Sequence, residues 1–245
     1  MKNTAIIIPT RLGAKRFPNK PLAKINNVPM IIHVLNRAQE SKVGEVFVAT
    51  PDNEIYKVVK KNGGKAILTK PEHPSGSDRV YEAYKKELQN EVDMIINLQG
   101  DMPNIKPDSI SKLEKLMRSN VCDIGTLASY ITDESEIKDP NIVKVHIDQA
   151  LSNDNFFSAK DFFRTKEDLN NEKIYHHCGI YIFTKDALSR YVNLPRSKLE
   201  IERSLEQMRA MENNMTIKVG LSNFMPLSVD TEEDLKKVSQ EMKKL

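Results

Sequence analysis

The sequence predicts an α/β fold in which helices flank a mainly parallel sheet. In the first half, short apolar runs typical of buried strands alternate with segments whose apolar residues recur at helical spacing. In the second half, β-rich segments dominate, which indicates a smaller mixed β extension of the sheet. Strands and helices that alternate at this spacing favour parallel βαβ units with right-handed crossovers.

Four strands and four helices are expected in the first half. Pro29 can begin the first helix, because a proline at the first helical position gives up no needed hydrogen bond. Asp52 can cap the second helix, and Ser75 and Asp78 have capping-box spacing ahead of the third. The fourth helix is expected from about 107 to 117. The strands are expected at 5–8, 45–50, 65–69 and 93–101.

The second half is expected to contain four strands, a mobile loop region and two helices. The loop region is the polar stretch at about 152–175. One continuous helix is predicted over 199–211, and Thr231 and Asp234 predict a capping box before the C-terminal helix. The strands are expected at 123–131, 141–148, 177–184 and 216–222. We expect a single domain, 1–245, made of a first half (about 1–120), a mixed β part (about 121–220) and a C-terminal helix (229–245).

Composition narrows the class of protein. The 245 residues include 37 Lys and Arg against 34 Asp and Glu, so the net charge is +3. That near balance argues against a nucleic-acid partner, whose footprint would be a strongly basic face. Cys122 and Cys178 form no metal or redox motif. No apolar run approaches the roughly 20 residues of a membrane span, so we expect a cytoplasmic protein without a membrane partner.

The opening loop, residues 10–20, follows the first predicted strand and holds four cations and no acid. These are Arg11, Lys15, Arg16 and Lys20. The sequence has neither a Walker motif nor the dinucleotide fingerprint, because Gly13 stands alone in the loop. The carboxyl ends of parallel strands are where such sheets bind phosphates. A solvated basic loop is the alternative, but the position favours a polyphosphate held by side-chain charge.

Two carboxylates follow other predicted strands. Asp101 comes after a buried strand and a glycine that permits a sharp turn, and Asp230 directly precedes the Thr231 cap. Each has a plain alternative, as a turn aspartate or as a charge favouring the helix dipole. Facing the opening loop together, they would form a Mg²⁺ site, because Mg²⁺ favours one or two carboxylates plus phosphate oxygens and water.

Eight segments in order resemble the sugar-activating nucleotidyltransferases, which have a Rossmann-like sheet, and within them the CMP-Kdo synthetase family. The resemblance spans nearly the whole chain, and the ordered set is more specific than any one piece. The segments are IIIPTRLGAKRFPNKPLAKINNVPMIIHVLNRA, VAT with Asp52, HPSGSDR, NLQGD, NIVKV, HCGIYIF, LEIERSLEQMR and VDTEEDL.

The resemblance implies an enzyme that joins CTP to a 3-deoxy-2-keto sugar acid, Kdo, and releases pyrophosphate, feeding lipopolysaccharide synthesis. It implies that the half at about 1–120 binds the nucleotide and that the mixed β part at about 121–220 serves the sugar and the contact of a homodimer. The implied catalytic residues are Lys20, Asp101 and Asp230, of which the two aspartates hold Mg²⁺. The implied nucleotide-binding residues are Arg11, Arg16, Lys20, Ser75, Gly76 and Ser77. The implied sugar-binding residues are Arg79, Gln99, His177, Tyr181, Glu206 and Gln207.

Several of these positions have a plain alternative. Arg79 could be a surface cation, and His177 a satisfied core histidine pointing away from the face of its neighbour His176. Glu206 falls beside the apolar stripe of its helix, so it could face a cleft or solvent, while Gln207 lies nearly opposite some stripe members.

The sequence also departs from the family at three positions. Met102 replaces a usual glutamate, Lys15 a usual hydroxyl residue and Ala159 an arginine near the sugar. Lys160 or Arg164 could substitute for that arginine, or the sugar could differ. An 8-amino analogue of Kdo and a sialic-acid-like sugar are the alternative substrates. A non-catalytic nucleotide-binding protein and an NAD-dependent dehydrogenase are the other classes, and the missing glycine fingerprint disfavours the last.

Overall fold

The computed structural model describes residues 3–13, 16–89, 91–165 and 173–243. The chain divides into two compact units. The first unit comprises Met1–Ser111 and Pro226–Leu245, and the second comprises Lys112–Met225. These limits lie near the predicted halves, while the single-domain prediction stays a prediction.

A parallel sheet forms the centre of the first unit. Its strands are β1 (Thr4–Pro9), β4 (Glu45–Thr50), β5 (Lys65–Leu68) and β6 (Met94–Leu98), in the order β5-β4-β1-β6. In the register, Ile6 lies opposite Val46 on one side and Ile96 on the other. All six residues of β1 are buried, as expected of a strand covered on both faces. The four predicted strands of the first half are therefore confirmed.

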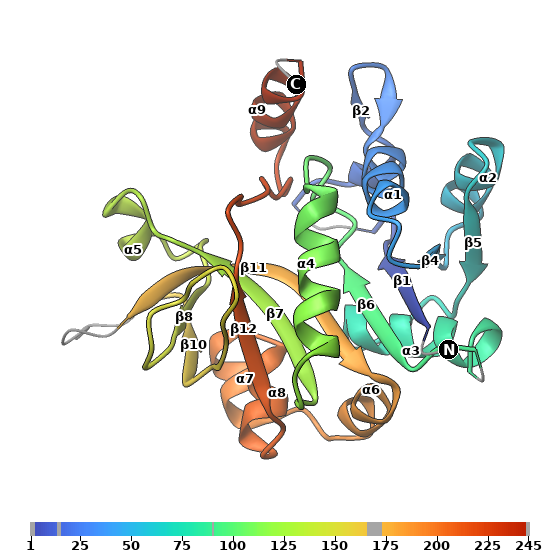
Figure 1. Ribbon diagram of the computed structural model, residues 1–245. Helices are drawn as coiled ribbons and strands as arrows, with labels where there is room; N and C mark the ends of the chain where they lie inside the picture. Colours follow the sequence, from blue (N-terminus) through green and yellow to red (C-terminus); the bar gives the residue numbers. More distant parts are fainter. Residues whose placement is uncertain (1–2, 14–15, 90, 166–172, 244–245) are drawn as a thin grey trace. The chain divides into compact units, whose positions relative to one another are not determined.

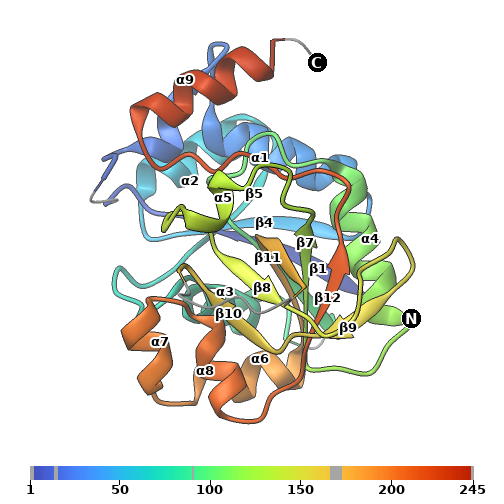
Figure 2. The ribbon, with the colours of Figure 1, turned by 90° about the vertical axis from the view of Figure 1, so that its left-hand side faces the viewer.

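Helices cover both faces of this sheet. Figure 2 shows α1 (Met30–Glu40) and α2 (Asn53–Lys61) on one side of β1 and β4, and α3 (Gly76–Glu87) on the other. Right-handed crossovers require this arrangement. Helices α1 and α2 connect β1 to β4 and β4 to β5 in one direction along the sheet, whereas α3 connects β5 to β6 in the opposite direction, so it lies on the opposite face. Helix α4 spans Pro107–Arg118.

The C-terminal helix α9 (Glu232–Glu241) packs on a small hairpin. Strands β2 (Lys24–Ile25) and β3 (Val28–Pro29) are joined through Asn26 and Asn27, whose φ angles of 49° and 69° suit a two-residue hairpin turn. Ile25 and Met30 share a buried cluster with Val229 and Val238, so helix α9 and the segment before it are packed against the hairpin. The sequence analysis did not anticipate this hairpin.

The second unit holds a mixed sheet (Figure 1). Its strands follow the order β11-β7-β12-β9, with β8 paired to β11 and to β10. Strands β7 and β12 are parallel and the other pairs are antiparallel. The strands are β7 (Ile124–Ser129), β8 (Lys144–His146), β9 (Phe156–Ser158), β10 (Asp161–Phe163), β11 (Ile174–Thr184) and β12 (Ile217–Leu221). The predicted α/β class with a mixed β extension is confirmed.

Two predictions about the second unit were wrong. The expected loop region at 152–175 contains β9 and β10, whose aromatic residues Phe156, Phe162 and Phe163 are buried; residues 166–172 lie outside the described residues. The expected helix over 199–211 is two helices, α7 (Lys198–Arg203) and α8 (Gln207–Glu212), because Ser204 adopts a φ of 53°. Ile201, which a continuous helix would place on one apolar face with Leu205 and Met208, is 57% exposed, whereas Leu205 and Met208 are buried. The remaining helices are α5 (Ser135–Lys138) and α6 (Lys185–Val192).

Candidate functional site

The opening loop is tied to the neighbouring strand end by backbone donors. The Thr10 amide donates to the Ala49 carbonyl at 3.0 Å, and the Leu12 amide donates to Asp52 Oδ2 at 2.8 Å. Asp52 occupies the N-cap position of α2 but makes no capping hydrogen bond. The predicted N-cap position is thus confirmed, but the expected side-chain capping bond is absent, because this carboxylate accepts from the opening loop instead. Lys15 lies outside the described residues.

Lys20 lies at the centre of a charged cluster in the first unit. Its Nζ donates to Asp101 Oδ2 at 3.0 Å, to Asp230 Oδ1 at 3.1 Å and to the Val229 carbonyl at 2.8 Å. The Val229 amide in turn donates to the Asp101 carbonyl at 2.9 Å, so the two carboxylate-bearing segments lie against each other. Arg16 Nη2 contacts the other oxygen of Asp230 at 2.8 Å. The structure therefore brings together four of the predicted site residues.

The electrostatics of this cluster favour a bound cation between the carboxylates. Burial alone lowers the pKa of Lys20, but the charges and hydrogen bonds of Asp101 and Asp230 outweigh it and raise that pKa. Two cations, Lys20 and Arg16, balance two anions. The Lys20 side chain is 15% exposed, against 63% for Arg16, so the lysine is the more buried partner and its ion pairs are less screened by water.

The two carboxylates suit a magnesium ion. The Lys20 ammonium shows that a positive charge is held between these carboxylates, because its Nζ lies within hydrogen-bond distance of both at once. Among the described residues, no group of three or more His, Cys, Asp or Glu side chains could hold a metal. Two protein ligands fit Mg²⁺ in particular, since it usually keeps several waters and takes oxygens from substrate phosphates.

Gly100 lies in the turn after β6 and also provides space there. A Cβ added there would lie 3.2 Å from the Pro9 carbonyl oxygen and 3.3 Å from the Thr10 Cβ. Its φ is not positive, unlike that of Gly63. The expected turn is present at Gly100 and Asp101, but it does not use a positive φ; the missing Cβ is what lets the strand end carrying Asp101 approach the opening loop closely.

The HPSGSDR segment begins α3 and connects to β6. Ser75 is the N-cap, its Oγ accepts from the Asp78 amide, and the same hydroxyl donates to Asp78 Oδ2 at 2.7 Å. Ser77 is buried and its Oγ accepts from Asn97 Nδ2 at 3.2 Å. Asn97 Oδ1 in turn accepts from Gln99 Nε2 at 3.1 Å. The sequence analysis missed Asn97, whose signal was a lone amide inside an apolar strand.

Arg79 is not a surface cation. It is 4% exposed, and its guanidinium donates to Thr69 Oγ1, to the Lys70 carbonyl at 2.9 Å and to the Pro71 carbonyl at 3.1 Å. Burial, and then the nearby positive charge of Arg11, lower the pKa of Arg79. Arg11 itself is exposed. The contacts of Arg79 with its own chain indicate a role in holding the preceding segment, while its sugar-binding role stays a prediction.

His177 and Tyr181 lie together on β11 in the second unit. Their ring centroids are 5.4 Å apart, and a register shift between Cys178 and Tyr181 interrupts the pairing with β7. His177 is 7% exposed, and its Nε2 lies 2.9 Å from Thr126 Oγ1. Burial lowers its pKa to about 3, so the ring is neutral near pH 7. His176 instead pairs with Glu136 at 2.7 Å, which agrees with the expected opposite orientation of the two histidines.

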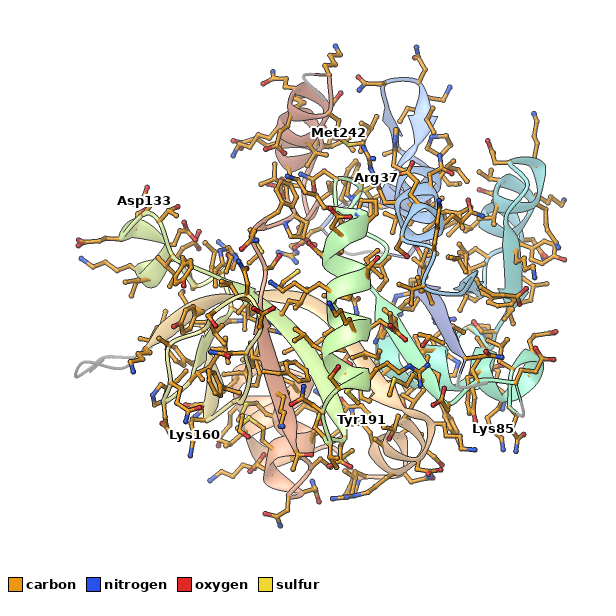
Figure 3. All side chains as sticks on the ribbon, viewed as in Figure 1. Arg37, Lys85, Asp133, Lys160, Tyr191 and Met242 are labelled. Atoms are coloured by element: carbon orange, nitrogen blue, oxygen red, sulfur yellow. The ribbon has the colours of Figure 1, made fainter. Side chains whose placement is uncertain are left out.

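Glu206 and Gln207 lie where α8 begins, and a buried ion pair fixes that helix. Arg209 donates to both oxygens of Glu200, at 2.8 and 2.7 Å, and both side chains are 2% exposed. The Tyr191 ring, which α6 carries (Figure 3), lies 4.7 Å from the Arg209 guanidinium carbon, and its hydroxyl donates to the Glu206 carbonyl. Gln207 is buried. The sequence analysis missed Glu200 and Arg209, whose spacing of nine gave no pairing signal.

The two cations that were expected to substitute for an arginine at Ala159 are both engaged in other contacts. Lys160, labelled in Figure 3, pairs with Asp148 at 2.9 Å. Arg164 donates to the Pro140 and Asn141 carbonyls, each at 3.1 Å. Both cations that could substitute therefore have partners within the second unit.

Comparison with known proteins gives the family. A family model described as cytidylyltransferase matches residues 5–217. The chain belongs to the cytidylyltransferase family. No helix in the described part of this cytidylyltransferase is long and apolar enough to cross a membrane.

Named relatives are similar to this cytidylyltransferase over almost its whole length. The 3-deoxy-manno-octulosonate cytidylyltransferase of Brucella canis is 43% identical over 95% of this chain and 92% of its own. That of Bartonella tribocorum is 42% identical over 95% of this chain and 96% of its own. A solved structure of CMP:2-keto-3-deoxy-manno-octonic acid synthetase complexed with CTP matches with a TM-score of 0.88 and 35% identity, covering 99% of each chain.

Proposed function

We propose that this cytidylyltransferase transfers the CMP group of CTP to the anomeric hydroxyl of Kdo, giving CMP-Kdo and pyrophosphate. The observation that carries the proposal is the bridge that Lys20 makes between Asp101 and Asp230 beside the cationic opening loop. Relatives 43% identical over 95% of the chain bear the name of this activity, which supports Kdo as the acceptor.

The chain's own residues would act mainly by positioning and by charge. Arg11, Arg16 and Lys20 would hold the triphosphate, so that the α-phosphorus faces the attacking oxygen in line with the leaving pyrophosphate. Asp101 and Asp230 would hold Mg²⁺, which supplies charge neutralisation at the phosphate and lowers the pKa of the attacking hydroxyl when bound. The hydroxyl oxygen forms the new bond to phosphorus as the bond to the β-phosphate oxygen breaks.

A neutral His177 fits the sugar side of this proposal. Because its pKa is about 3, the ring would meet the sugar as a hydrogen-bonding group and not as a cation. Ser75, Gly76 and Ser77 would contact the nucleotide, and Gln99, Tyr181, Glu206 and Gln207 would contact the sugar. We further propose a cytoplasmic homodimer that feeds lipopolysaccharide synthesis; light scattering on the purified chain tests the dimer.

The test of the proposed function is pyrophosphate release. Purified enzyme given CTP, Mg²⁺ and Kdo should release pyrophosphate, and Asp101→Asn should abolish release while leaving the fold intact. Asp108→Asn is the matched control, because Asp108 is an exposed aspartate in the first turn of α4. An Asp101→Asn enzyme that keeps the full rate would refute the metal assignment, and wild-type enzyme without release would refute the function.

An 8-amino analogue of Kdo is the second candidate acceptor. Ala159 stands where the family usually has an arginine, and Lys160 and Arg164 are already paired. A sugar that carries its own cation would suit a pocket with one positive charge fewer. Comparing kcat/KM for the two sugars decides between them, and a much higher value for Kdo would exclude this candidate.

A further inference from the structure

The β5–α3 segment, residues 69–75, is held by two side chains from one face of α3. Arg79 donates to the Thr69 hydroxyl and to the carbonyls of Lys70 and Pro71. Glu82, three residues further along the helix, accepts from the Lys70 amide with both carboxylate oxygens, at 3.2 and 3.0 Å. Both backbone polar groups of Lys70 are therefore fixed by side chains of opposite charge.

Glu82 also fixes the segment further along the chain. Its Oε2 lies 2.5 Å from His73 Nε2, and its Oε1 pairs with Lys86 at 2.7 Å. The Glu82 side chain is 14% exposed, and that of His73 is 12% exposed. Hydrogen bonds from Lys86, Lys70 and His73 outweigh the effect of burial and lower the pKa of Glu82 to about 2. The carboxylate is thus charged throughout the neutral range.

These contacts leave a short stretch of backbone available to a ligand. The backbone groups of Glu72, His73 and Pro74 have no hydrogen-bond partner in the described part of the chain. Pro74 lacks an N–H, so the stretch offers three free carbonyls but two free amides, and a second proline, Pro71, directly precedes it. Proline also fixes the φ angle at both positions. The stretch is therefore rich in acceptors and restricted in conformation.

An acceptor-rich backbone can distinguish the two pyrimidines. Cytosine carries an exocyclic amino donor where uracil carries an oxygen acceptor. A backbone carbonyl aimed at this position accepts a hydrogen bond from the amino group of cytosine. The oxygen of uracil cannot donate, so the carbonyl is left without a partner and uracil binds less tightly. For the Glu72 and Pro74 carbonyls, the distinction fails if the peptide plane can rotate, because the N–H of the following residue then replaces the carbonyl; for the His73 carbonyl, rotation removes the acceptor without supplying an N–H. Selectivity therefore requires that the segment be held.

We infer that Arg79 and Glu82 are positioning residues that hold the β5–α3 segment so that its free carbonyls select cytosine over uracil. This inference rests on the proposed function, which puts the nucleotide at Ser75–Ser77. Neither side chain needs to touch the base. Both act through the backbone of Lys70, and Glu82 acts also through His73.

The test compares the affinities for CTP and UTP by isothermal titration calorimetry, which needs no turnover. Glu82→Gln should reduce the preference for CTP by about tenfold, because CTP affinity falls while UTP affinity changes little. Arg79→Lys keeps the charge but loses the forked geometry and should act in the same direction. Glu87→Gln is the matched control, since Glu87 is an exposed residue at the end of the same helix, as is Lys85 (Figure 3); it should leave the preference unchanged.

Two results would overturn the inference. Equal losses of CTP and UTP affinity in Glu82→Gln would mean that the contacts only support the fold, and an unchanged preference would mean that they do not position the segment. If Glu82→Gln does not fold, the fallback variant is His73→Phe, which removes one contact of the same carboxylate. It should reduce the preference for CTP over UTP about threefold, and an unchanged preference in this variant would also refute the inference. A wild-type protein without pyrophosphate release would refute the proposed function instead.

Discussion

Replacing Lys20 with methionine should destabilise the free protein while strengthening its response to magnesium. The ammonium makes three hydrogen bonds, to Asp101, to Asp230 and to the Val229 carbonyl. Methionine has a stem of similar length and no donor. The variant therefore leaves two carboxylates close together without the cation that lies between them.

The size of the effect follows from the geometry. At 3.0 Å and an effective dielectric of about 20, each ammonium–carboxylate contact has a Coulomb energy of about 5 kcal/mol, an upper bound that desolvation reduces. Charge-assisted hydrogen bonds contribute about 1.5–3 kcal/mol each, and the carboxylates are partly solvated, so we expect Lys20→Met to cost about 2–3 kcal/mol. For a chain of this size that is a fall in Tm of about 4–12 °C.

Magnesium should recover part of this loss in the variant. In the wild type the ammonium competes for the two carboxylates, whereas in Lys20→Met a metal would meet them without it, with only the exposed Arg16 still paired to Asp230. A tenfold gain in affinity would add about 1.4 kcal/mol of stability at saturating metal. Thermal melts across a magnesium series, with a calcium-free buffer and no nucleotide, measure this difference directly.

Arg16→Met is the matched control for the melts. Arg16 contacts the same Asp230, but it is 63% exposed, and exposed ion pairs contribute about 1 kcal/mol or less. The reasoning is refuted if the two variants melt alike, or if magnesium stabilises wild type and Lys20→Met by the same amount.

Three further predictions concern titratable groups. Because the pKa of Glu82 is lowered from 4.5 to about 2, the stabilising effect of its carboxylate is complete above about pH 4.5 and is lost as the pH falls toward 2. Between pH 5 and pH 2.5, the free energy of unfolding measured in urea should therefore fall by about 1–3 kcal/mol more for wild type than for Glu82→Gln. His177, whose pKa is lowered from 6.5 to about 3, should show the NMR shifts of a neutral ring down to pH 4.5, and a midpoint near 6.5 would contradict its burial. Burial raises the thiol pKa of Cys122 to about 11 and of Cys178 to about 12, so Ellman's reagent should label both slowly at pH 8 and rapidly in guanidinium; fast native labelling would contradict this.

Local patterns were sufficient for most of the strands and helices. The buried run at Ala5–Ile8 became β1, and the Thr231 and Asp234 spacing became a complete capping box. These predictions succeeded because apolar periodicity and capping depend on residues a few positions apart. The helix over 199–211 failed because Ser204 took a left-handed conformation, which helical spacing does not reveal.

The sequence also indicated which residues of the first unit gather at a strand end. The opening loop, Asp101 and Asp230 were each expected at the carboxyl end of the sheet or beside it, and the structure joins them through Lys20. The sequence did not indicate which of these charged side chains pair with one another. Asp52 was expected to cap a helix, yet it holds Leu12, because a carboxylate near several donors takes the one that the fold brings closest.

By itself, then, the sequence determined the α/β class, the elements of the parallel sheet and the residue types at the charged site, since all of these depend on local order along the chain. The tertiary structure decided which groups meet across long separations: Lys20 with Asp230, Asn97 with Ser77, and Glu200 with Arg209. It also showed that Arg79 is a buried support and that Gly100 provides space. Hydrogen-bond partners and burial depend on how distant segments pack, and a linear pattern does not contain that information.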